Sequence, residues 1–424
     1  MNKIKLKNPV KLAIFCVLIL SFLNSRINII SKEATESKGD LDTYKKAIET
    51  FISGGNPYSE TVESYADLKS NPGDKGFAYP PFLLYLYAPF HAVHLYFQSN
   101  YPHGYYFTER FYFDLVGFLA DIGTGVLIYL IMRGLKVSKL AILFGLFVWF
   151  FNPYIYKSND YYPNDLVVVF LTTLALYFSG IKKDQVLSGF FLGLASATKT
   201  YPILLFPIML YFSSPNTAEI NSLNSLIRYS YTKLKGSRYF LISFALSLFL
   251  LSLSFMSSFD NFLTFIHGSL LVQSERFVQG RPFLYYISYF YKVEFLRMVP
   301  FNVYTTLAAV SGIIISFVLA VLSNGRQYLK RVCNVFSLSA IILAFFYLFT
   351  PVLNRTYLIW IIPSLCVAFF NLFQHKKLVF GYMAVTAFWL FYYFYLLPYT
   401  LYLIPYTFCL FLTFNFQLFF PDME

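Results

Sequence analysis

Two carboxylates lie two residues apart in the stretch "GDLD", at Asp40 and Asp42. Of two such neighbours, one can accept a proton from a hydroxyl as a general base, while the other orients the hydroxyl or binds a divalent cation. On spacing alone a solvated pair of loop charges is the better explanation, because D-x-D pairs are short and common. Chemistry is therefore indicated only if the neighbouring residues can hold a substrate.

Aromatic residues on predicted turns follow the two aspartates. "GGNPY" ends at Tyr58 and "FAYPPF" contains Tyr79, and the Gly and Pro residues of both stretches predict tight turns. Tyr44 lies closer still, on the same stretch as Asp42. A pyranose offers apolar C–H faces and a rim of hydroxyls, so aromatic rings beside carboxylates favour a sugar-binding site.

A lone lysine, Lys199, interrupts the long apolar run "ASATKTYPILL". A charged side chain in such a run is costly, so it either snorkels to the membrane interface or pairs with an anion. Snorkelling is the structural explanation. The functional one is a contact with a phosphate that its lipid holds at the membrane surface.

Further polar residues lie at the predicted outer ends of membrane helices, in "SNDYYPND" and "LNRTYLIW", where they either cap helices or contact a substrate. The arginines of "QSERFVQGRPF" could bind a phosphate, although an outer arginine beside the membrane is ordinarily solvated. With Asp40 and Asp42 as catalytic candidates, the predicted substrate contacts are Tyr44, Tyr58, Tyr79, Asn164, Asp165, Lys199, Tyr201, Arg276, Arg281, Asn354, Arg355 and Tyr357. The sequence leaves a metal requirement open.

Membrane helices must position these residues. Of the 424 residues, 57% are hydrophobic and 13% are charged, which is typical of a chain that crosses a membrane many times. A span needs about 20 apolar residues, and the sequence predicts an all-α bundle of about 10 to 13 transmembrane helices. The net charge of +12 does not indicate nucleic-acid binding, because the basic residues form short clusters between the spans.

The predicted spans are 9–29, 107–132, 139–157, 164–181, 239–257, 302–323, 333–352, 356–373, 378–397 and 400–419. Clusters of Lys and Arg between them predict cytoplasmic loops and cytoplasmic termini. We therefore expect one multi-pass integral membrane domain over residues 1–424, in the plasma membrane of a prokaryote or the endoplasmic reticulum of a eukaryote. Residues 30–106 and 258–301 form the expected external loops.

Two segments depart from simple alternation of spans and loops. Residues 80–97 predict an aromatic helix along the outer interface, and residues 186–212 predict a hairpin of two short helices broken at "KTYP". Interrupted backbone at membrane depth is tolerated only where it is buried in protein or lines a wet cavity, so the hairpin is a candidate site. Asp114 and Asp121 are expected to face the bundle interior, and His91 to be structural.

The order of these motifs resembles the GT-C fold membrane glycosyltransferases that use polyprenyl- or dolichyl-phosphate sugars. The likeness is to the catalytic subunit of GPI mannosyltransferase I and to the family 87 mannosyltransferases. It rests on the D-x-D pair, the turns at Tyr58 and Tyr79, the Asn-Asp element at Asp165, the Lys-x-Tyr-Pro at Lys199 and finally Tyr357. It covers most of the chain.

This resemblance implies a GT-C bundle with external juxtamembrane helices and an inverting hexosyltransferase, with mannose as the expected sugar. The donor would be a dolichyl- or polyprenyl-phosphate sugar and the acceptor a lipid-linked glycan or glycolipid, at the external or lumenal face among membrane lipids. Asp42, or else Asp40, would be the base, and Lys199 would contact the phosphate. The rival is a transporter or flippase of a lipid-linked sugar, a class that tends to show internal repeats and midplane charges.

Overall fold

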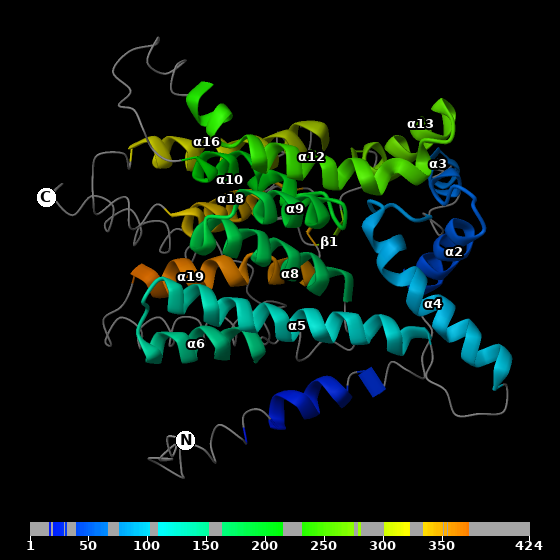
Figure 1. Cartoon of the computed structure of the whole chain (residues 1–424), viewed down its shortest axis with the longest axis horizontal. Helices are drawn as coiled ribbons and strands as arrows, with labels where there is room; N and C mark the ends of the chain where they lie inside the picture. Colours follow the sequence, from blue (N-terminus) through cyan, green and yellow to red (C-terminus); the bar gives the residue numbers. More distant parts are fainter. Residues whose placement is uncertain are drawn as a thin grey trace, which may run out of the picture.

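The computed structural model describes residues 17, 20–28, 30–31, 40–66, 76–101, 109–151, 163–214, 231–274, 279–280, 301–322, 334–350, 352–353 and 355–372. They form an elongated helical bundle with α2, α3, α4 and α13 at one end (Figure 1). The α-helices are α2 (Asp40–Ile52), α3 (Tyr58–Ala66), α4 (Phe82–Asn100), α5 (Glu109–Gly134), α6 (Lys139–Phe150), α8 (Pro163–Tyr177), α9 (Gln185–Ser196), α10 (Phe206–Ser213), α12 (Arg238–Ser252), α13 (Phe259–Ser269), α16 (Phe301–Leu322), α18 (Val335–Phe349) and α19 (Ile362–Leu372).

Shorter elements connect several of these helices. A π-helical turn, η1 (Phe178–Lys182), extends α8, and the 3-10 turns are η2 (Tyr201–Leu205), η3 (Leu253–Phe255), η4 (Leu271–Ser274) and η5 (Arg355–Ile359). The strands β1 (Gln279–Gly280) and β2 (Val352–Leu353) pair in parallel. This small ladder ties the predicted second external loop to the segment just before η5.

Apolar helices dominate the described part of the chain. Four stretches there are long and apolar enough to cross a membrane: Glu109–Gly134, Pro163–Lys182, Arg238–Phe255 and Val303–Val321. Shorter apolar stretches accompany them, including Lys139–Phe150 and Val335–Phe349. The chain is an all-α polytopic membrane protein, as its composition predicts.

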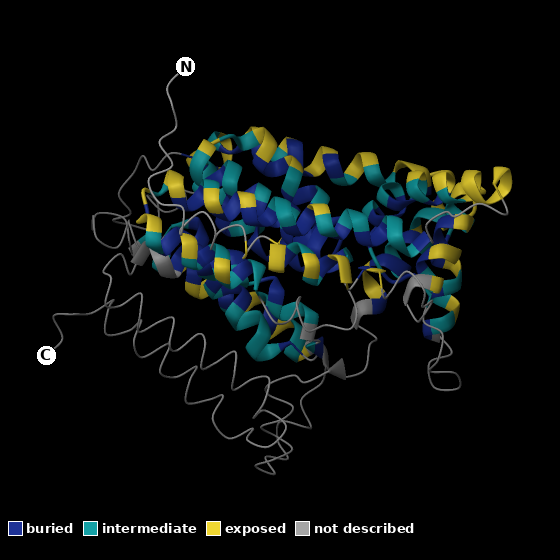
Figure 2. Cartoon of the chain, turned by 90° about the horizontal axis from the view of Figure 1, so that it is seen from below, coloured by how far each residue is buried: buried dark blue, intermediate teal, exposed yellow. Residues whose placement is uncertain are grey.

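The bundle has a buried centre and an apolar periphery. In the apolar stretch of α8, 67% of the residues are buried, whereas the share is 22% in those of α12 and α16. Figure 2 shows buried residues along the middle of the bundle and exposed ones on its outer helices. Helix α8, which carries Asn164 and Asp165 in its first turn, is therefore a central element.

Helix α9 packs closely on α12 because two glycines form a G-x-x-x-G pair on its face. A Cβ atom at Gly189 would lie 2.3 Å from the carbonyl oxygen of Phe240, and one at Gly193 would lie 1.7 Å from Oγ of Ser247. Larger residues at either position would push the two helices apart.

The predicted broken hairpin over residues 186–212 is confirmed. Helix α9 ends at Ser196, and regular structure resumes within the "KTYP" stretch as η2, which α10 follows. The two ends of the hairpin meet because Nε2 of Gln185 donates a hydrogen bond of 2.7 Å to the carbonyl oxygen of Ser213. Lys199 therefore lies at the interruption, on backbone buried in the protein.

A buried ion pair joins the N-terminal helical segment 20–28 to the bundle. Nε of Arg26 lies 2.9 Å from Oδ2 of Asp121 on α5, and both side chains are completely buried. The guanidinium also donates to the carbonyl oxygen of Phe150 at 3.0 Å. The expectation that Asp121 faces the bundle interior is confirmed, with Arg26 as its partner.

The D-x-D pair opens helix α2, so the expectation that it lies in a loop is wrong. Tyr44, Ala47 and Ile48 are buried at the i, i+3 and i+4 spacing of an amphipathic helix, and α2 packs on α4. Tyr58 and Phe77 extend this aromatic end core. Burying a large apolar side chain contributes about 1.5–3 kcal/mol, so these residues hold α2 as a helix against the end of the bundle.

Other expected elements are partly described. Of the expected interfacial helix 80–97, residues 82–97 are helical within α4, and residues 333–352 contain α18. The predicted span 356–373 begins as η5 and continues as α19. The expected spans 378–397 and 400–419 lie outside the described residues.

Candidate active site

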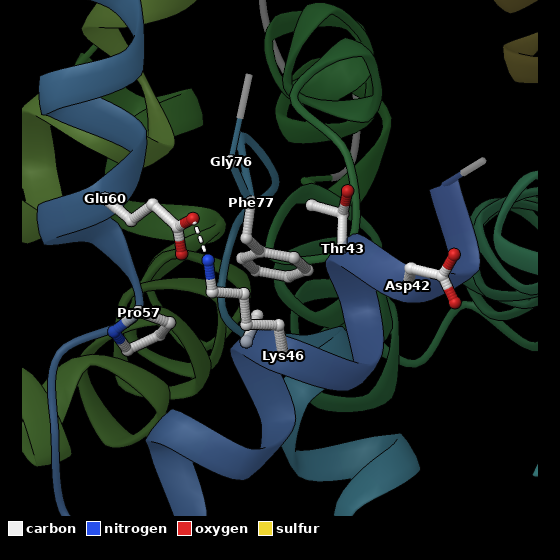
Figure 3. A pocket seen from close by; sticks show the side chains of 8 residues that line it. Asp42, Thr43, Lys46, Pro57, Glu60, Gly76 and Phe77 are labelled. Atoms are coloured by element: carbon white, nitrogen blue, oxygen red, sulfur yellow. Dashed lines mark hydrogen bonds and ion pairs between the residues drawn. The ribbon is translucent and has the colours of Figure 1, made fainter. Parts of the chain in front are cut away.

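Asp42 lines a pocket of about 280 Å³ at the end of the molecule that carries α2 and α3. In Figure 3 the side chains of Lys46 and Glu60 form an ion pair at the pocket, and the Asp42 carboxylate points away from that pair. The lining residues are Asp42, Thr43, Lys46, Ala47, Pro57, Glu60, Gly76 and Phe77. The pocket thus offers an exposed carboxylate beside an ion pair whose charges cancel.

Tyr58 supports this region from below the surface. Its side chain is completely buried, and its hydroxyl donates a hydrogen bond of 2.8 Å to the carbonyl oxygen of Tyr79. Burial raises the pKa of Tyr58 well above its ordinary value, so the hydroxyl remains a donor at neutral pH. The "NPY" turn is tied in place by Asn56, whose Nδ2 donates to Oδ1 of Asn261 at 2.8 Å. Tyr58 therefore positions Tyr79.

Tyr79 lies between helix α2 and the broken hairpin. Its ring centroid is 5.4 Å from that of Tyr44 on α2, and Nζ of Lys199 is 5.5 Å from the Tyr79 centroid. An ammonium over an aromatic face is attracted by the quadrupole of the ring. Tyr79 therefore contacts both helix α2, which carries Asp42, and the interrupted segment that carries Lys199.

Lys199 is buried in an aromatic cage, and one carboxylate, that of Asp165, contacts its ammonium. Its Nζ lies 2.5 Å from Oδ1 of Asp165, and its side chain is 10% exposed. The ring centroids of Tyr357 and Trp360 lie 5.2 Å and 5.3 Å from Nζ. The ammonium therefore does not snorkel away from the protein. It is held inward by Asp165.

Trp360 contacts both the carboxylate and the tyrosine rings of this cage. Its indole Nε1 donates a hydrogen bond of 2.8 Å to Oδ1 of Asp165. On one side its ring stacks on Tyr201 with centroids 3.9 Å apart and an interplanar angle of 4°, and on the other it stacks on Tyr357 at 4.1 Å. Tyr201 and Tyr357 thereby fix the plane of the indole.

Asn164 and Asp165 are positioned by the start of α8. Both are buried in its first turn, where the helix dipole favours the carboxylate of Asp165. Oδ1 of Asn164 accepts a hydrogen bond of 2.8 Å from the hydroxyl of Tyr87 on α4. Helix α4 is therefore connected to the central helix next to the Lys199 pair.

The sequence profile of glycosyltransferase family 87 matches residues 77–351. The chain belongs to glycosyltransferase family 87. It is also similar to proteins named GPI mannosyltransferase 1 from two yeasts: 31% identity over 109 residues with that of Debaryomyces hansenii, and 27% over 147 residues with that of Candida albicans. These matches cover 24% and 33% of this chain and 26% and 35% of the two relatives.

In this family 87 chain, the profile match contains Tyr79, Asp165 and Lys199, but helix α2 and Trp360 lie outside it. Six of the predicted substrate contacts lie close together in the structure. They are Tyr44, Tyr79, Asp165, Lys199, Tyr201 and Tyr357. Arg276, Arg281 and Asn354 lie outside the described residues, as do the side chains of Asp40 and Arg355.

Trp360 and Tyr87 are not among the site residues predicted from the sequence. Trp360 follows Tyr357 at helical i+3 spacing, and that spacing was the available signal. Tyr87 stands in a run of aromatic residues in α4, where nothing distinguishes it from its neighbours. Its hydrogen bond depends on α4 meeting α8, which only the tertiary fold decides.

A second polar cluster of the family 87 chain joins α2, α4 and α5. Nδ1 of the buried His91 contacts Oε1 of Glu109, and Nζ of Lys45 lies 3.9 Å from Oε2 of the same glutamate. The acidic partner of His91 comes from the start of α5, and a structural role for this histidine stays a prediction. Among the described residues there is no group of three or more His, Cys, Asp or Glu side chains that could hold a metal ion.

Proposed function

We propose that this membrane glycosyltransferase is an inverting mannosyltransferase that uses a dolichyl- or polyprenyl-phosphate mannose as donor. The acceptor is a lipid-linked glycan or glycolipid, and transfer takes place at the external or lumenal face. The family supports sugar transfer, and the names of the two yeast relatives support mannose. The GT-C fold and both lipid substrates are parts of the proposal.

The position of Tyr79 carries the proposal. Its ring is in contact range of Tyr44, two positions beyond Asp42 on α2, and of the Lys199 ammonium. A transferase needs a base for the acceptor hydroxyl and a positive charge for the departing phosphate, on either side of one sugar. A pyranose can pack its C–H face on an aromatic ring between the two groups.

The reaction follows as a single displacement. The acceptor hydroxyl loses its proton to Asp42, or to Asp40 if the two roles are exchanged, as its oxygen forms a bond to the anomeric carbon. The bond between that carbon and the phosphate oxygen breaks with its electron pair, which leaves the lipid phosphate with an additional negative charge. Attack opposite the leaving group inverts the configuration at the anomeric carbon.

Lys199 stabilises the charge that develops on the phosphate. An ammonium carries three donors, and the described hydrogen bond of Lys199 uses one of them, to Asp165. Stabilisation of developing charge by one such contact is worth about 3–4 kcal/mol in well-studied enzymes. Arg276, Arg281 and Arg355 are proposed to assist at the phosphate, with Asn354 nearby on the acceptor or donor.

The Asp42 pocket is the proposed acceptor site. Its ion pair between Lys46 and Glu60 can hydrogen-bond sugar hydroxyls without adding net charge, and the buried Phe77 and Pro57 form part of its wall. Asp42 is exposed and lines this pocket, and we propose that its carboxylate accepts the proton of an acceptor hydroxyl bound there. The external loop 30–106 would thus carry both the pocket and the interfacial helix α4.

The test is transfer by the purified chain. Detergent-solubilised protein is incubated with labelled polyprenyl-phosphate mannose, glucose or galactose and a lipid extract as acceptor, and labelled glycolipid is measured together with its anomeric configuration. We expect transfer from the mannose donor with inversion. Movement of the donor across proteoliposomes without any labelled product would favour the transporter, and retention of configuration would exclude the single displacement.

A further inference from the structure

This inference rests on the proposed function. We propose that the Asp165 carboxylate pairs with the Lys199 ammonium until the donor phosphate binds, and that the two anions compete for this cation. The indole of Trp360 keeps Asp165 hydrogen-bonded when Lys199 turns toward the donor. Asp165 and Trp360 are then positioning residues, which act on the donor through Lys199 and not by contact with the sugar.

One oxygen atom carries both contacts. Oδ1 of Asp165 accepts from Nζ of Lys199 at 2.5 Å and from Nε1 of Trp360 at 2.8 Å. All three residues are buried, with whole-residue relative exposures of 4%, 8% and 5% for Asp165, Lys199 and Trp360. Two donors therefore share a single carboxylate in a place from which water is largely excluded.

The charge balance makes Asp165 a competitor of the donor. Buried charges are tolerated when they are paired, and the Lys199 ammonium is paired with Asp165. A lipid phosphate at Lys199 adds a second anion to the same cation. A substitution that weakens the Asp165–Lys199 ion pair should thus strengthen phosphate binding. A substitution that strengthens the pair should weaken phosphate binding.

The indole lowers the cost of sharing the cation. A buried carboxylate that loses its only partner costs far more than one that keeps a hydrogen bond. Trp360 is held between the rings of Tyr201 and Tyr357, so its N–H remains aimed at Asp165 while the lysine moves. Without that N–H, Asp165 depends on Lys199 alone and holds it more tightly.

These arguments give opposite signs for two substitutions. Trp360→Phe keeps a stacking ring and removes the donor, so it should weaken binding of a polyprenyl monophosphate by about tenfold, the ordinary scale for one hydrogen bond to a charged group. Asp165→Asn removes the competing charge, so it should tighten binding by a similar factor. Trp360→Phe should have little further effect in the Asp165→Asn background.

The chain offers a matched control. Trp149 is buried like Trp360, with no exposed surface, and its Nε1 donates to the backbone carbonyl oxygen of Asp121 at 3.0 Å. Trp149→Phe therefore removes the same group from the bundle without touching the Lys199 pair. It should change thermal stability to an extent similar to Trp360→Phe and leave phosphate binding unchanged.

The experiment measures the dissociation constant of a short-chain polyprenyl monophosphate by titration calorimetry on the full detergent-solubilised chain, with the donor KM and kcat measured in parallel. Opposite shifts for Trp360→Phe and Asp165→Asn, absent in Trp149→Phe, support the inference. Shifts of the same sign, or equal effects of the two tryptophan substitutions, overturn it. If Trp360→Phe does not purify, Asp165→Asn decides alone, and unchanged or weaker binding overturns the inference.

The binding measurement separates this inference from the proposed function. If the binding pattern holds but no sugar is transferred, the phosphate site stands and the transferase proposal fails. If sugar is transferred while the binding pattern is absent, only the positioning role fails. If the wild-type chain binds no polyprenyl phosphate, both are overturned.

Discussion

Lys199 and Asp165 show how this protein carries charge inside an apolar bundle. Each neutralises the other at 2.5 Å, and aromatic rings surround the ammonium where water would otherwise solvate it. Breaking a buried pair by removing one partner costs about 3–5 kcal/mol, because the remaining charge is left uncompensated. A single substitution here therefore mixes a structural effect with a catalytic one.

The two effects can be separated at Lys199. Lys199→Met should lower turnover by about 10² to 10³ through lost stabilisation of the phosphate, and should also lower the melting temperature because Asp165 is left unpaired. The double variant Lys199→Met/Asp165→Asn removes both charges, so it should regain much of the stability but none of the activity.

Lys233→Met is the control, because Lys233 is another buried lysine whose ammonium donates to the backbone carbonyls of Tyr211 and Ser214. It should retain activity. Turnover that returns together with stability in the Lys199/Asp165 double variant would assign the pair a purely structural role.

Asp42 is the residue on which the proposed chemistry depends most. Asp42→Asn preserves size but removes the proton acceptor, so the rate should fall by about 10² to 10⁴ while polyprenyl phosphate still binds. Asp40→Asn should cost less if Asp40 orients the acceptor, and more if the roles are exchanged. Initial rates of both variants in one assay decide between them. Full activity in both and in the double variant would remove the carboxylates from the chemistry.

At the scale of elements, Asp42 stands on a helix and not in a loop. It lies two positions before the buried Tyr44 of the same helix. Helix α2 is held by Tyr44 and Ile48 in the aromatic end core and by Lys45 at Glu109 of α5. The position of Asp42 thus depends on packing at the end of the bundle.

The α9–α12 contact determines where the broken hairpin sits. Gly189→Ala and Gly193→Ala should each destabilise the protein by about 1–3 kcal/mol through overpacking, measured as thermal unfolding in detergent. Ser247→Ala should relieve part of the Gly193 effect, because it removes the Oγ that the new Cβ would meet at 1.7 Å. It should not relieve the Gly189 effect, where the obstacle is the backbone oxygen of Phe240. Equal rescue of both would contradict this packing.

At the scale of the whole molecule, the proposed sidedness places α2, α3 and α4 outside and the segment before α12 in the cytoplasm. The charge rule supports this, because residues 213–238 contain four basic residues, Arg228, Lys233, Lys235 and Arg238, and one acid, Glu219. Ser59→Cys on α3 and Lys235→Cys before α12 should therefore react from opposite sides of sealed vesicles with an impermeant thiol reagent. Both positions are exposed. Labelling of both from the same side would overturn the external site.

Much of the architecture could be predicted from the sequence. Composition identified a helical membrane protein, and the proline after Tyr201 indicated the break in the 186–212 hairpin, because hydropathy and backbone chemistry are local properties. The residue types of the site, a carboxylate pair, aromatic turns and a lone lysine, are local in the same way. The helical state of α2 was also within reach, since Tyr44, Ala47 and Ile48 follow a helical spacing.

The partners of the charged residues were decided by the tertiary structure alone. Lys199 meets Asp165, 34 residues away, and Asp165 meets Trp360, 195 residues away. Arg26 and Asp121 are separated by 95 residues. Such pairs depend on which faces of distant helices come together, and that outcome follows from close packing of the entire bundle, which no local pattern of residues encodes.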